Sequence, residues 1–252
     1  AVHHPVSVDC AIAMQESSPL WLLKYALLKR WQKNICRSAS HIMTVSETVK
    51  KRLHQDYGCD TSKVHIVPNG VDGKEFTMVE DAEFDVCAVG SLLHPRKGFR
   101  YLVDAYKKLS TVRIADVGRR SAEQHQEVAK LPHVTVLGML DHEDLVHTIQ
   151  RSKVLISTSL YEGFGISLIE ALACGRPVVA FDSGAVREVL SPIDPEMIVP
   201  QRDIDALTKR VQEYVSISEE RRRKLREEVL RRYSLAQSAE ALVRLYAELV
   251  SR

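Results

Sequence analysis

The chain is most informative between residues 161 and 175, where it reads Tyr161-Glu162-Gly163-Phe164-Gly165-Ile166-Ser167-Leu168-Ile169-Glu170-Ala171-Leu172-Ala173-Cys174-Gly175. Two glycines leave a turn with few side chains directly after the apolar run 154–156. We expect a helix from about Ile166 to Gly175, because glycine readily takes the left-handed conformation that follows a helix end. The unpaired N–H groups at a helix start carry the positive end of the dipole and form a natural seat for phosphate.

Glu170 lies about one turn into this expected helix, so its carboxylate can border the same pocket. A carboxylate accepts two hydrogen bonds at once, which suits a vicinal diol such as a ribose. Phosphate donors beside a diol acceptor predict a nucleotide-sugar site. The alternative is a buried structural glutamate that caps a neighbouring loop, and it is less favoured because glutamate is rarely buried without a partner.

Strand and helix patterns alternate from residue 84 onward. The expected strands are mostly continuous apolar runs, as in a parallel sheet covered on both faces: 84–90, 112–118, 134–138, 154–159, 177–181 and 197–200. Helical patterns fall between or after them: 98–110, 121–130, 141–152, 166–174, 184–190 and 203–216. Ser121 with Gln124 forms a capping-box pattern, and Asp141 and Asp203 are expected N-caps. This series predicts an α/β fold with a doubly wound, Rossmann-like parallel sheet.

The first 80 residues follow a different pattern and predict only a partial α/β segment. Ser18-Pro19 is expected to open a helix, strands are expected at 41–45 and 64–67 around a helix that ends at Gly58, and 70–80 reads as a linker. At the other end, arginine and glutamate crowd the expected exposed helix 219–232. Ser234 with Gln237 marks the start of a last helix.

Apolar stripes occur on two of these helices. The first stripe follows Pro19 and consists of Leu20, Leu23, Leu27, Trp31 and Ile35. Its helix also carries Lys24, Lys29, Arg30, Lys33 and Arg37 on other faces. Such a basic amphipathic helix can contact an anionic membrane surface, although general burial statistics favour a packed helix with a solvated basic face. The second stripe lies within 241–249, and exposure of either stripe would predict dimerisation or limited solubility.

Composition narrows the class of protein. The 252 residues are 45% apolar and 27% charged, typical of a globular domain, and the formal charge of +2 gives no reason to expect nucleic acid. The five scattered cysteines contain no CxxC pair, which favours reduced thiols in the cytoplasm over disulfides or zinc. No apolar run approaches the ~18 residues that span a bilayer, and the histidines show no metal-ligand spacing.

Several short motifs then run in order along most of the chain. They are Val45-Ser46-Glu47, Val67-Pro68-Asn69-Gly70-Val71-Asp72, Val89-Gly90, Arg96-Lys97-Gly98, Val136-Leu137-Gly138, the stretch 161–180 and Arg187-Glu188-Val189. Each is weak alone, but together they resemble the retaining, GT-B-fold glycosyltransferases of family 4, also called glycosyltransferase group 1. The resemblance implies two Rossmann domains, with the acceptor held by the N-terminal one and the nucleotide sugar by the C-terminal one.

By this resemblance, residues 1–80 are the end of the acceptor-side domain plus a linker, and 81–232 are the complete donor domain. Residues 233–252 are then the helix that returns to the first domain. We therefore expect either a fragment or one half of an enzyme. In the second case the acceptor domain is supplied by a partner chain or by a second copy in a homodimer. Either form is expected to be inactive on its own.

The resemblance also implies roles for single residues. Lys97 places a cation on the donor diphosphate with help from Arg96, although Ser91 stands where the family often has an arginine. A solvated side chain is the alternative for Lys97, and the Pro-Arg-Lys-Gly setting disfavours it. Glu170 binds the ribose, and Ser167 donates to a phosphate.

On the sugar side, the resemblance places Glu162 near hydroxyls of the transferred sugar, together with backbone N–H groups of the segment that follows. That segment comprises Gly163, Phe164, Gly165 and Ile166. Gly138 lies in the segment whose backbone contacts the nucleobase. His3, in His3-His4-Pro5, matches a histidine near the transferred sugar.

These roles predict transfer of a sugar from a nucleotide-diphosphate sugar to a hydroxyl of a glycan, lipid or small molecule, with retention and without metal or cofactor. The chain is expected in the cytoplasm, with peripheral contact at the inner membrane face. Alternatives are a non-catalytic nucleotide-sugar-binding module or one subunit of a split enzyme. A glycosidase is disfavoured because its two carboxyls flank the scissile bond, and a dinucleotide-binding domain because no GxGxxG follows the first strands.

Overall fold

The computed structural model describes residues 1–16 and 19–251. The helices are α1 Val6–Gln15, α2 Pro19–Ser38, α3 Glu47–Tyr57, α4 Phe99–Lys108, α5 Ala122–Ala129, α6 His142–Gln150, α7 Ile166–Ala173, α8 Val186–Leu190, α9 Ile204–Tyr214, α10 Glu219–Tyr233 and α11 Leu235–Val250. The strands are β1 Ile42–Thr44, β2 Val64–Ile66, β3 Phe84–Val89, β4 Ile114–Val117, β5 Val134–Gly138, β6 Ser152–Ser157, β7 Val178–Phe181 and β8 Ile198–Val199. Ser18, the expected start of the second helix, lies outside the described residues.

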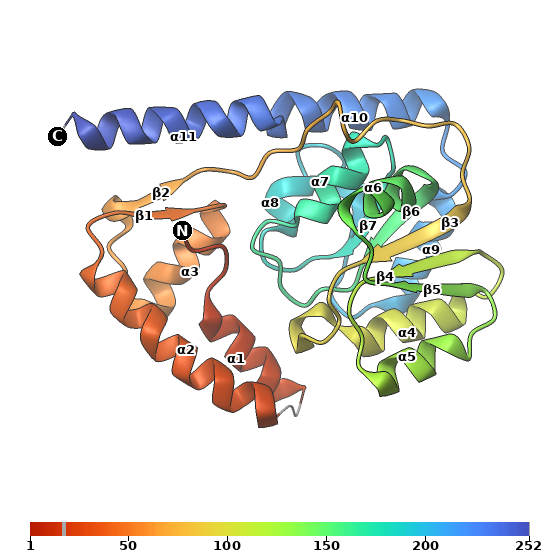
Figure 1. Cartoon of the computed structure of the whole chain (residues 1–252), viewed down its shortest axis with the longest axis horizontal. Coiled ribbons are helices and arrows are strands. Elements are labelled where there is room, and N and C mark those ends of the chain that lie inside the picture. The colour runs from red at the N-terminus through yellow and green to blue at the C-terminus, as the bar shows by residue number, and fades with distance from the viewer. Residues whose placement is uncertain (17–18, 252) are drawn as a thin grey trace.

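The larger part of the molecule is built on a six-stranded sheet, with strand order β5-β4-β3-β6-β7-β8 and helices on both faces (Figure 1). All five strand pairings are parallel. Counted from β3, the order is 3-2-1-4-5-6, which confirms the expected doubly wound α/β fold. The order reverses between β3 and β6, and ligands of such sheets bind outside the carboxyl ends of the strands at this point.

Local sequence signals set the ends of several helices as expected. Ser121 and Gln124 form the predicted capping box at α5. The side chains of Asp141 and Asp203 accept hydrogen bonds at the starts of α6 and α9. Gly175 follows α7 with φ +66°, the left-handed conformation predicted for it.

One strand lies two residues earlier than predicted: β6 covers residues 152–157 instead of 154–159. Its register with β3 starts at Phe84↔Ser152, two residues earlier than the apolar run suggests. At the other end Thr158 leaves the sheet, and its hydroxyl donates to the carbonyl oxygens of Lys97 and Gly98, each at 3.2 Å. Pairing with a neighbouring loop therefore decides where the strand ends.

The N-terminal residues form a smaller unit around the parallel pair β1 and β2. Val2 extends this pair through a bridge to Thr44. Its small core is separate from the core of the large sheet and comprises Val2, Cys36, Ile42, Val49, Leu53, Tyr57, Cys59 and Val64. All five cysteines are free thiols.

Helix α2 presents a different face to this unit than its apolar stripe suggests. The residues turned inward include Tyr25 and Cys36, which are buried, whereas Leu20, Leu23 and Trp31 are exposed. The helix is thus packed and its basic residues are exposed, as the favoured alternative expects, but the side that packs is not the apolar stripe. None of the described helices is long and apolar enough to cross a membrane.

The last two helices run along one side of the molecule and connect its two units (Figure 1). The segment that follows β2 crosses them at their junction, where the Val71 N–H donates to the Tyr233 carbonyl at 2.8 Å and the Val71 carbonyl accepts from the Leu235 N–H at 3.0 Å. A Cβ atom at Gly70 would lie 2.6 Å from the Leu235 Cα, so this crossing requires glycine. From there α11 runs toward the end of the molecule that holds β1 and β2 (Figure 1).

Candidate functional site

Two loops at the carboxyl ends of β3 and β6 form the floor of the candidate site. The loop after β3 contains a short 3-10 helix, Pro95–Lys97, which ends at Gly98 with φ +66°. A Cβ atom at Gly98 would lie 2.2 Å from the Thr158 carbonyl oxygen, so the two loops approach closely here. A hydrogen bond of 2.7 Å from the Leu160 N–H to the Arg96 carbonyl adds to this contact. Lys97 is thereby held beside the loop that carries Glu162.

The loop after β6 leads into α7 and contacts the N-terminal unit. A Cβ atom at Gly163 would lie 2.0 Å from the His3 carbonyl oxygen, so no larger residue fits between the two segments. The Ser46 hydroxyl donates to the Gly163 carbonyl at 2.7 Å. Gly165 takes φ +93° and allows α7 to start at Ile166, as predicted. The start of α7 therefore faces the gap between the two units.

A cavity of about 500 Å³ lies in this gap. Its lining combines predicted site residues with residues that had no predicted role: His3, His4, Val45, Asn69, Val89, Gly90, Arg96, Lys97, Leu145, Glu162, Gly163, Phe164, Gly165, Ile166, Ser167 and Glu170. The structure thus brings together every predicted site residue except Gly138. Gly138 ends the edge strand β5, where its carbonyl accepts from the Gly118 N–H at 2.6 Å.

Charged side chains of alternating sign line one wall of the cavity. The Lys97 ammonium lies 2.5 Å from Glu162 Oε1, and the Arg96 guanidinium lies 4.0 Å from Glu162 Oε2. Burial alone would raise the pKa of Glu162, but the positive charges of Lys97 and Arg96 lower it below its usual value. Glu162 is therefore ionised at neutral pH and holds the Lys97 ammonium in place until another anion competes for it.

Asp9 of α1 extends this row of charges and was missed by sequence reasoning. Its carboxylate is 2% exposed and lies 2.7 Å from His4 Nε2 and 3.3 Å from Arg96 Nε. One buried carboxylate therefore positions both the histidine next to His3 and the arginine next to Lys97. The sequence around Asp9 carries no recognisable motif, because only the folded chain brings α1 against the 95–97 helix.

Glu170 lies on α7 and lines the same cavity. Burial raises the pKa of its carboxyl to about 7, and the negative charge of Glu75 adds to this rise, whereas His142 opposes it. The described residues offer the Glu170 carboxylate no hydrogen bond. A buried carboxyl with free acceptor positions that lines a cavity is suited to bind hydroxyl groups of a ligand.

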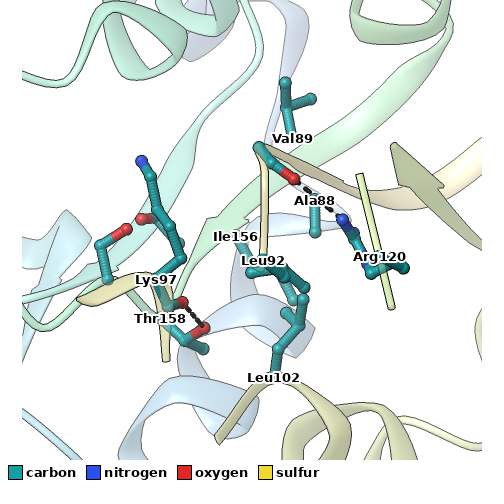
Figure 2. Close-up of a pocket in the computed structure, with 11 residues that line it drawn as sticks. Ala88, Val89, Leu92, Lys97, Leu102, Arg120, Ile156 and Thr158 are labelled. Atoms are coloured by element: carbon teal, nitrogen blue, oxygen red, sulfur yellow. Dashed lines mark hydrogen bonds between the residues drawn. The ribbon is translucent and has the colours of Figure 1, made fainter. Parts of the chain in front are cut away.

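Behind Lys97 lies a second, much smaller cavity of about 20 Å³, enough for one water molecule (Figure 2). Figure 2 shows Lys97 and Arg120 on opposite sides of it. Arg120 donates to the Gly90 carbonyl at 2.9 Å and pairs with the fully buried Asp116 at 2.5 Å. Its guanidinium is thus committed to fixing the end of β3, so Arg96 and Lys97 are the cations that reach the main cavity.

Five of the six missed lining residues had a sequence signal, including Val45, Val89 and Gly90, which belong to quoted motifs. Asn69 lies within the motif 67–72 and His4 directly follows His3, so both belonged to segments already singled out. Leu145 had none, since it is one of many leucines on amphipathic helices. Among the described residues, no group of three or more histidine, cysteine, aspartate or glutamate side chains is arranged to hold a metal ion.

As a whole, the arrangement offers two cations, a helix start and an unpaired carboxyl around one cavity. Cations and helix-start N–H groups are suited to bind a diphosphate, and a carboxylate is suited to bind a diol. The cavity therefore has the chemistry of a nucleotide-sugar site.

Two family models match the sequence in consecutive segments. The one described as "Glycosyl transferases group 1" matches residues 83–216, and the one described as "Glycosyltransferase Family 4" matches residues 3–75. Among solved structures, sucrose-phosphate synthase from Thermosynechococcus elongatus superposes with a TM-score of 0.75 at 24% identity, over 87% of this chain and 61% of that one. Anabaena HepE in complex with UDP and glucose superposes with a TM-score of 0.74 at 18% identity, over 94% and 69%. These likenesses confirm the expected relation to GT-B folds.

The relatives found by sequence comparison are also glycosyltransferases. The chain is 31% identical over 232 residues to the MMP alpha-(1->4)-mannosyltransferase of Mycolicibacterium hassiacum, covering 82% of this chain and 54% of that protein. It is 32% identical over 181 residues to the phosphatidyl-myo-inositol mannosyltransferase of Mycolicibacterium smegmatis, covering 66% and 45%. The chain spans about half the length of the curated relatives it matches. On the family match and the first of these relatives, the chain belongs to the glycosyl transferases group 1 family.

Proposed function

We propose that this chain binds a nucleotide-diphosphate sugar in the 500 Å³ cavity and takes part in transferring its hexose to a hydroxyl acceptor, with retention at the anomeric carbon. The observation that carries the proposal is the convergence of Lys97, the α7 start and Glu170 on one cavity. The names of the relatives support it, since several are mannosyltransferases. Mannose is therefore the first hexose to test.

In this proposal Lys97 and Arg96 bind the diphosphate, and Ser167 with the N–H groups at the start of α7 binds its far side. The Glu170 carboxylate accepts hydrogen bonds from the ribose hydroxyls, and backbone N–H groups from Gly163 to Ile166 contact the transferred sugar. The Gly138 segment is proposed to approach the nucleobase.

The reaction centre is proposed to lie near Glu162 and His3, on the side of the N-terminal unit. The diphosphate gains negative charge as it departs, and Lys97 stabilises that charge because it already lies in the cavity wall. Glu162 binds sugar hydroxyls, and His3 lies beside the transferred sugar. The leaving phosphate itself takes the acceptor proton, so the scheme requires neither a metal nor a cofactor.

A second candidate is a non-catalytic nucleotide-sugar-binding module, or one subunit of a split transferase. The acceptor, a glycan, lipid or small molecule, would then be held by a partner chain or a second copy. The proposed location is the cytoplasm, at the inner face of a membrane. Turnover of a donor by this chain alone would exclude the second candidate.

The test is a calorimetric titration of the chain with UDP, GDP and ADP, each with and without magnesium. We expect micromolar binding of one nucleotide without metal and loss of that binding in Glu170→Ala. Glu123→Ala, which removes an exposed glutamate on α5, serves as the matched control and should bind as the wild type does. Unchanged nucleotide affinity in Glu170→Ala would contradict the ribose role, and absence of binding by all three nucleotides would contradict the donor site.

A further inference from the structure

Helix α2 has an outer face that nothing in the described chain covers. Its inner face packs through Tyr25, which is 5% exposed, and Cys36, which is 3% exposed. The outer face carries the apolar stripe, in which Leu20 is 82%, Leu23 68%, Leu27 67% and Trp31 65% exposed. These residues recur every three or four positions, so they form one continuous row along the helix. A row of this length is unusual on a surface in contact with water alone.

Charge distinguishes this face from an ordinary exposed helix. The 20 residues of α2 include five basic residues and no acidic one. At about 100° per residue, Arg30, Lys33 and Arg37 follow one edge of the apolar stripe, and Lys24 lies at the other. All five basic residues are exposed. An apolar row bordered by cations on both sides is complementary to a surface that is apolar inside and anionic at its boundary.

A row of exposed apolar side chains on α11 lacks this pattern. It is not the predicted stripe, because Leu242, Leu245 and Leu249 are partly buried. Val243 is 66% and Tyr246 60% exposed, but the charged neighbours there are Glu240, Arg244 and Glu248. An exposed apolar row is therefore not always bordered by basic residues, and the basic borders of α2 are a separate feature of that helix. The two helices form a natural pair of test and control within one molecule.

We propose that α2 lies in the interface of a membrane that contains anionic lipids, with its apolar stripe at the boundary between headgroups and acyl chains. Trp31 sits on this stripe, and tryptophan is enriched at membrane interfaces. A second copy of the chain is a poorer occupant, because face-to-face pairing of α2 would bring ten cations together.

The inner side of α2 connects this surface to the loop after β3, which carries Lys97. The Trp21 ring lies 4.7 Å from the His94 ring, and the Tyr25 hydroxyl lies 3.3 Å from His94 Nδ1. His94 directly precedes the 95–97 helix that carries Lys97. Docking of α2 would thus hold the membrane close to the cavity. The inference goes beyond the proposed reaction and does not depend on it.

The experiment uses tryptophan fluorescence, because the chain contains only Trp21 and Trp31. In the full chain carrying Trp21→Phe, Trp31 is the sole reporter. Vesicles of phosphatidylcholine with phosphatidylglycerol should shift its emission to the blue, and brominated acyl chains should quench it. Vesicles of phosphatidylcholine alone should produce a much weaker response, and added salt should release the protein from the anionic vesicles.

Three variants test the surface by vesicle co-sedimentation. Leu23→Glu/Leu27→Glu should abolish binding, and Lys29→Gln/Arg30→Gln/Lys33→Gln should lower the partition coefficient by about a hundredfold, since each surface cation contributes about 1 kcal/mol. The control Val243→Glu/Tyr246→Glu on α11 should bind as the wild type does. Circular dichroism should be unchanged in all three, because every substituted side chain is exposed.

Three results would overturn the proposal. They are equal binding to neutral and anionic vesicles, equal loss of binding in the α11 control, and absence of vesicle binding altogether. In the last case, sedimentation velocity shows whether the wild type is a dimer that Leu23→Glu/Leu27→Glu dissociates, which would assign the face to a second copy.

Discussion

Glu162 and Glu170 line the same cavity, but the folded chain gives their carboxyls opposite properties. Glu162 is paired with the Lys97 ammonium, and this charge keeps its pKa below the usual value despite burial. Glu170 has no such cation, and burial raises its pKa to about 7. Two carboxyls whose pKa values are driven apart in one cavity can hold different roles at a single pH. One is a fixed anion, and the other can titrate near neutrality.

Glu170 should therefore make stability depend on pH. Because its folded pKa of about 7 lies above the value of 4.5 expected when unfolded, the folded chain holds the proton more tightly. The stabilisation is complete below about pH 4.5 and is lost as pH rises through 7. Glu170→Gln should then raise the free energy of unfolding at pH 8 by about 3 kcal/mol and leave it nearly unchanged at pH 4.5. Urea unfolding of both proteins at the two pH values measures this.

The control is Glu240→Gln, which removes an exposed carboxylate on α11. Its effect on the free energy of unfolding should be small and the same at both pH values. A pH-independent effect of Glu170→Gln would show that the carboxyl is already paired in the free protein.

The ion pair between Lys97 and Glu162 can also be tested directly. The side chains are 18% and 11% exposed, so each charge depends on the other for compensation. Lys97→Met alone should lower the free energy of unfolding at pH 7 by about 3 kcal/mol, because it leaves the carboxylate nearly unpaired. The double variant Lys97→Met/Glu162→Gln should recover most of this loss. Urea unfolding of the wild type, Lys97→Met, Glu162→Gln and the double variant gives the coupling energy, and strictly additive effects would contradict the pairing.

At the scale of elements, the start of α3 is satisfied by a residue from the other unit. Glu188 of α8 accepts from the Glu47 N–H at 2.8 Å, from the Thr48 N–H at 2.9 Å and from the Thr48 hydroxyl at 2.8 Å. Ser46 caps the next N–H, that of Val49, at 3.2 Å. A carboxylate at a helix start also meets the positive end of the helix dipole. The motifs 45–47 and 187–189, which had no predicted role, are therefore the two halves of one contact.

Removing this contact should weaken the packing between the two units. We expect Glu188→Ala to lower the free energy of unfolding by about 1–2 kcal/mol, since it leaves two N–H groups and a hydroxyl without their partner. Glu47→Gln is the matched control, because it removes an exposed carboxylate at the same helix end. Equal stability of Glu188→Ala and wild type in urea unfolding would mean that the contact contributes nothing in solution.

At the scale of the whole molecule, the two units differ greatly in the size of their cores. The large sheet has six strands between two helical layers, whereas β1 and β2 have three residues each. Small cores open with lower free energy, so amides of β1 and β2 should exchange with deuterium faster than those of β3 and β6. Hydrogen exchange read by mass spectrometry measures this.

The same experiment on Glu188→Ala separates the contribution of the contact between the units. Exchange should accelerate in α3 and stay unchanged in β6. Equal protection of both sheets in the wild type would show that the two units open together.

Much of the large unit could be predicted, because its signals are local. Continuous apolar runs predicted its strands, and Ser121, Asp141 and Gly175 predicted helix ends by hydrogen-bonding and backbone preferences that act within a few residues. The stretch 161–175 likewise predicted the turn and the start of α7. The N-terminal unit was harder, since the apolar residues of α2 are divided between an inner face and an exposed stripe.

The sequence by itself therefore determined the fold class, the helix start that faces the cavity and most of the residues that line it. Only the tertiary structure decided that Asp9 joins His4 to Arg96, that Glu188 caps α3 and that Arg120 is held by Asp116. Asp9 lies far from Arg96 along the chain, and Glu188 lies far from the start of α3, so these contacts depend on how two elements pack. Asp116 and Arg120 are only four residues apart, but they pair only in the folded loop after β4. Hydrogen bonding within a turn is encoded locally, whereas the burial that raises the Glu170 pKa and the contacts that pair Lys97 exist only after the chain has folded.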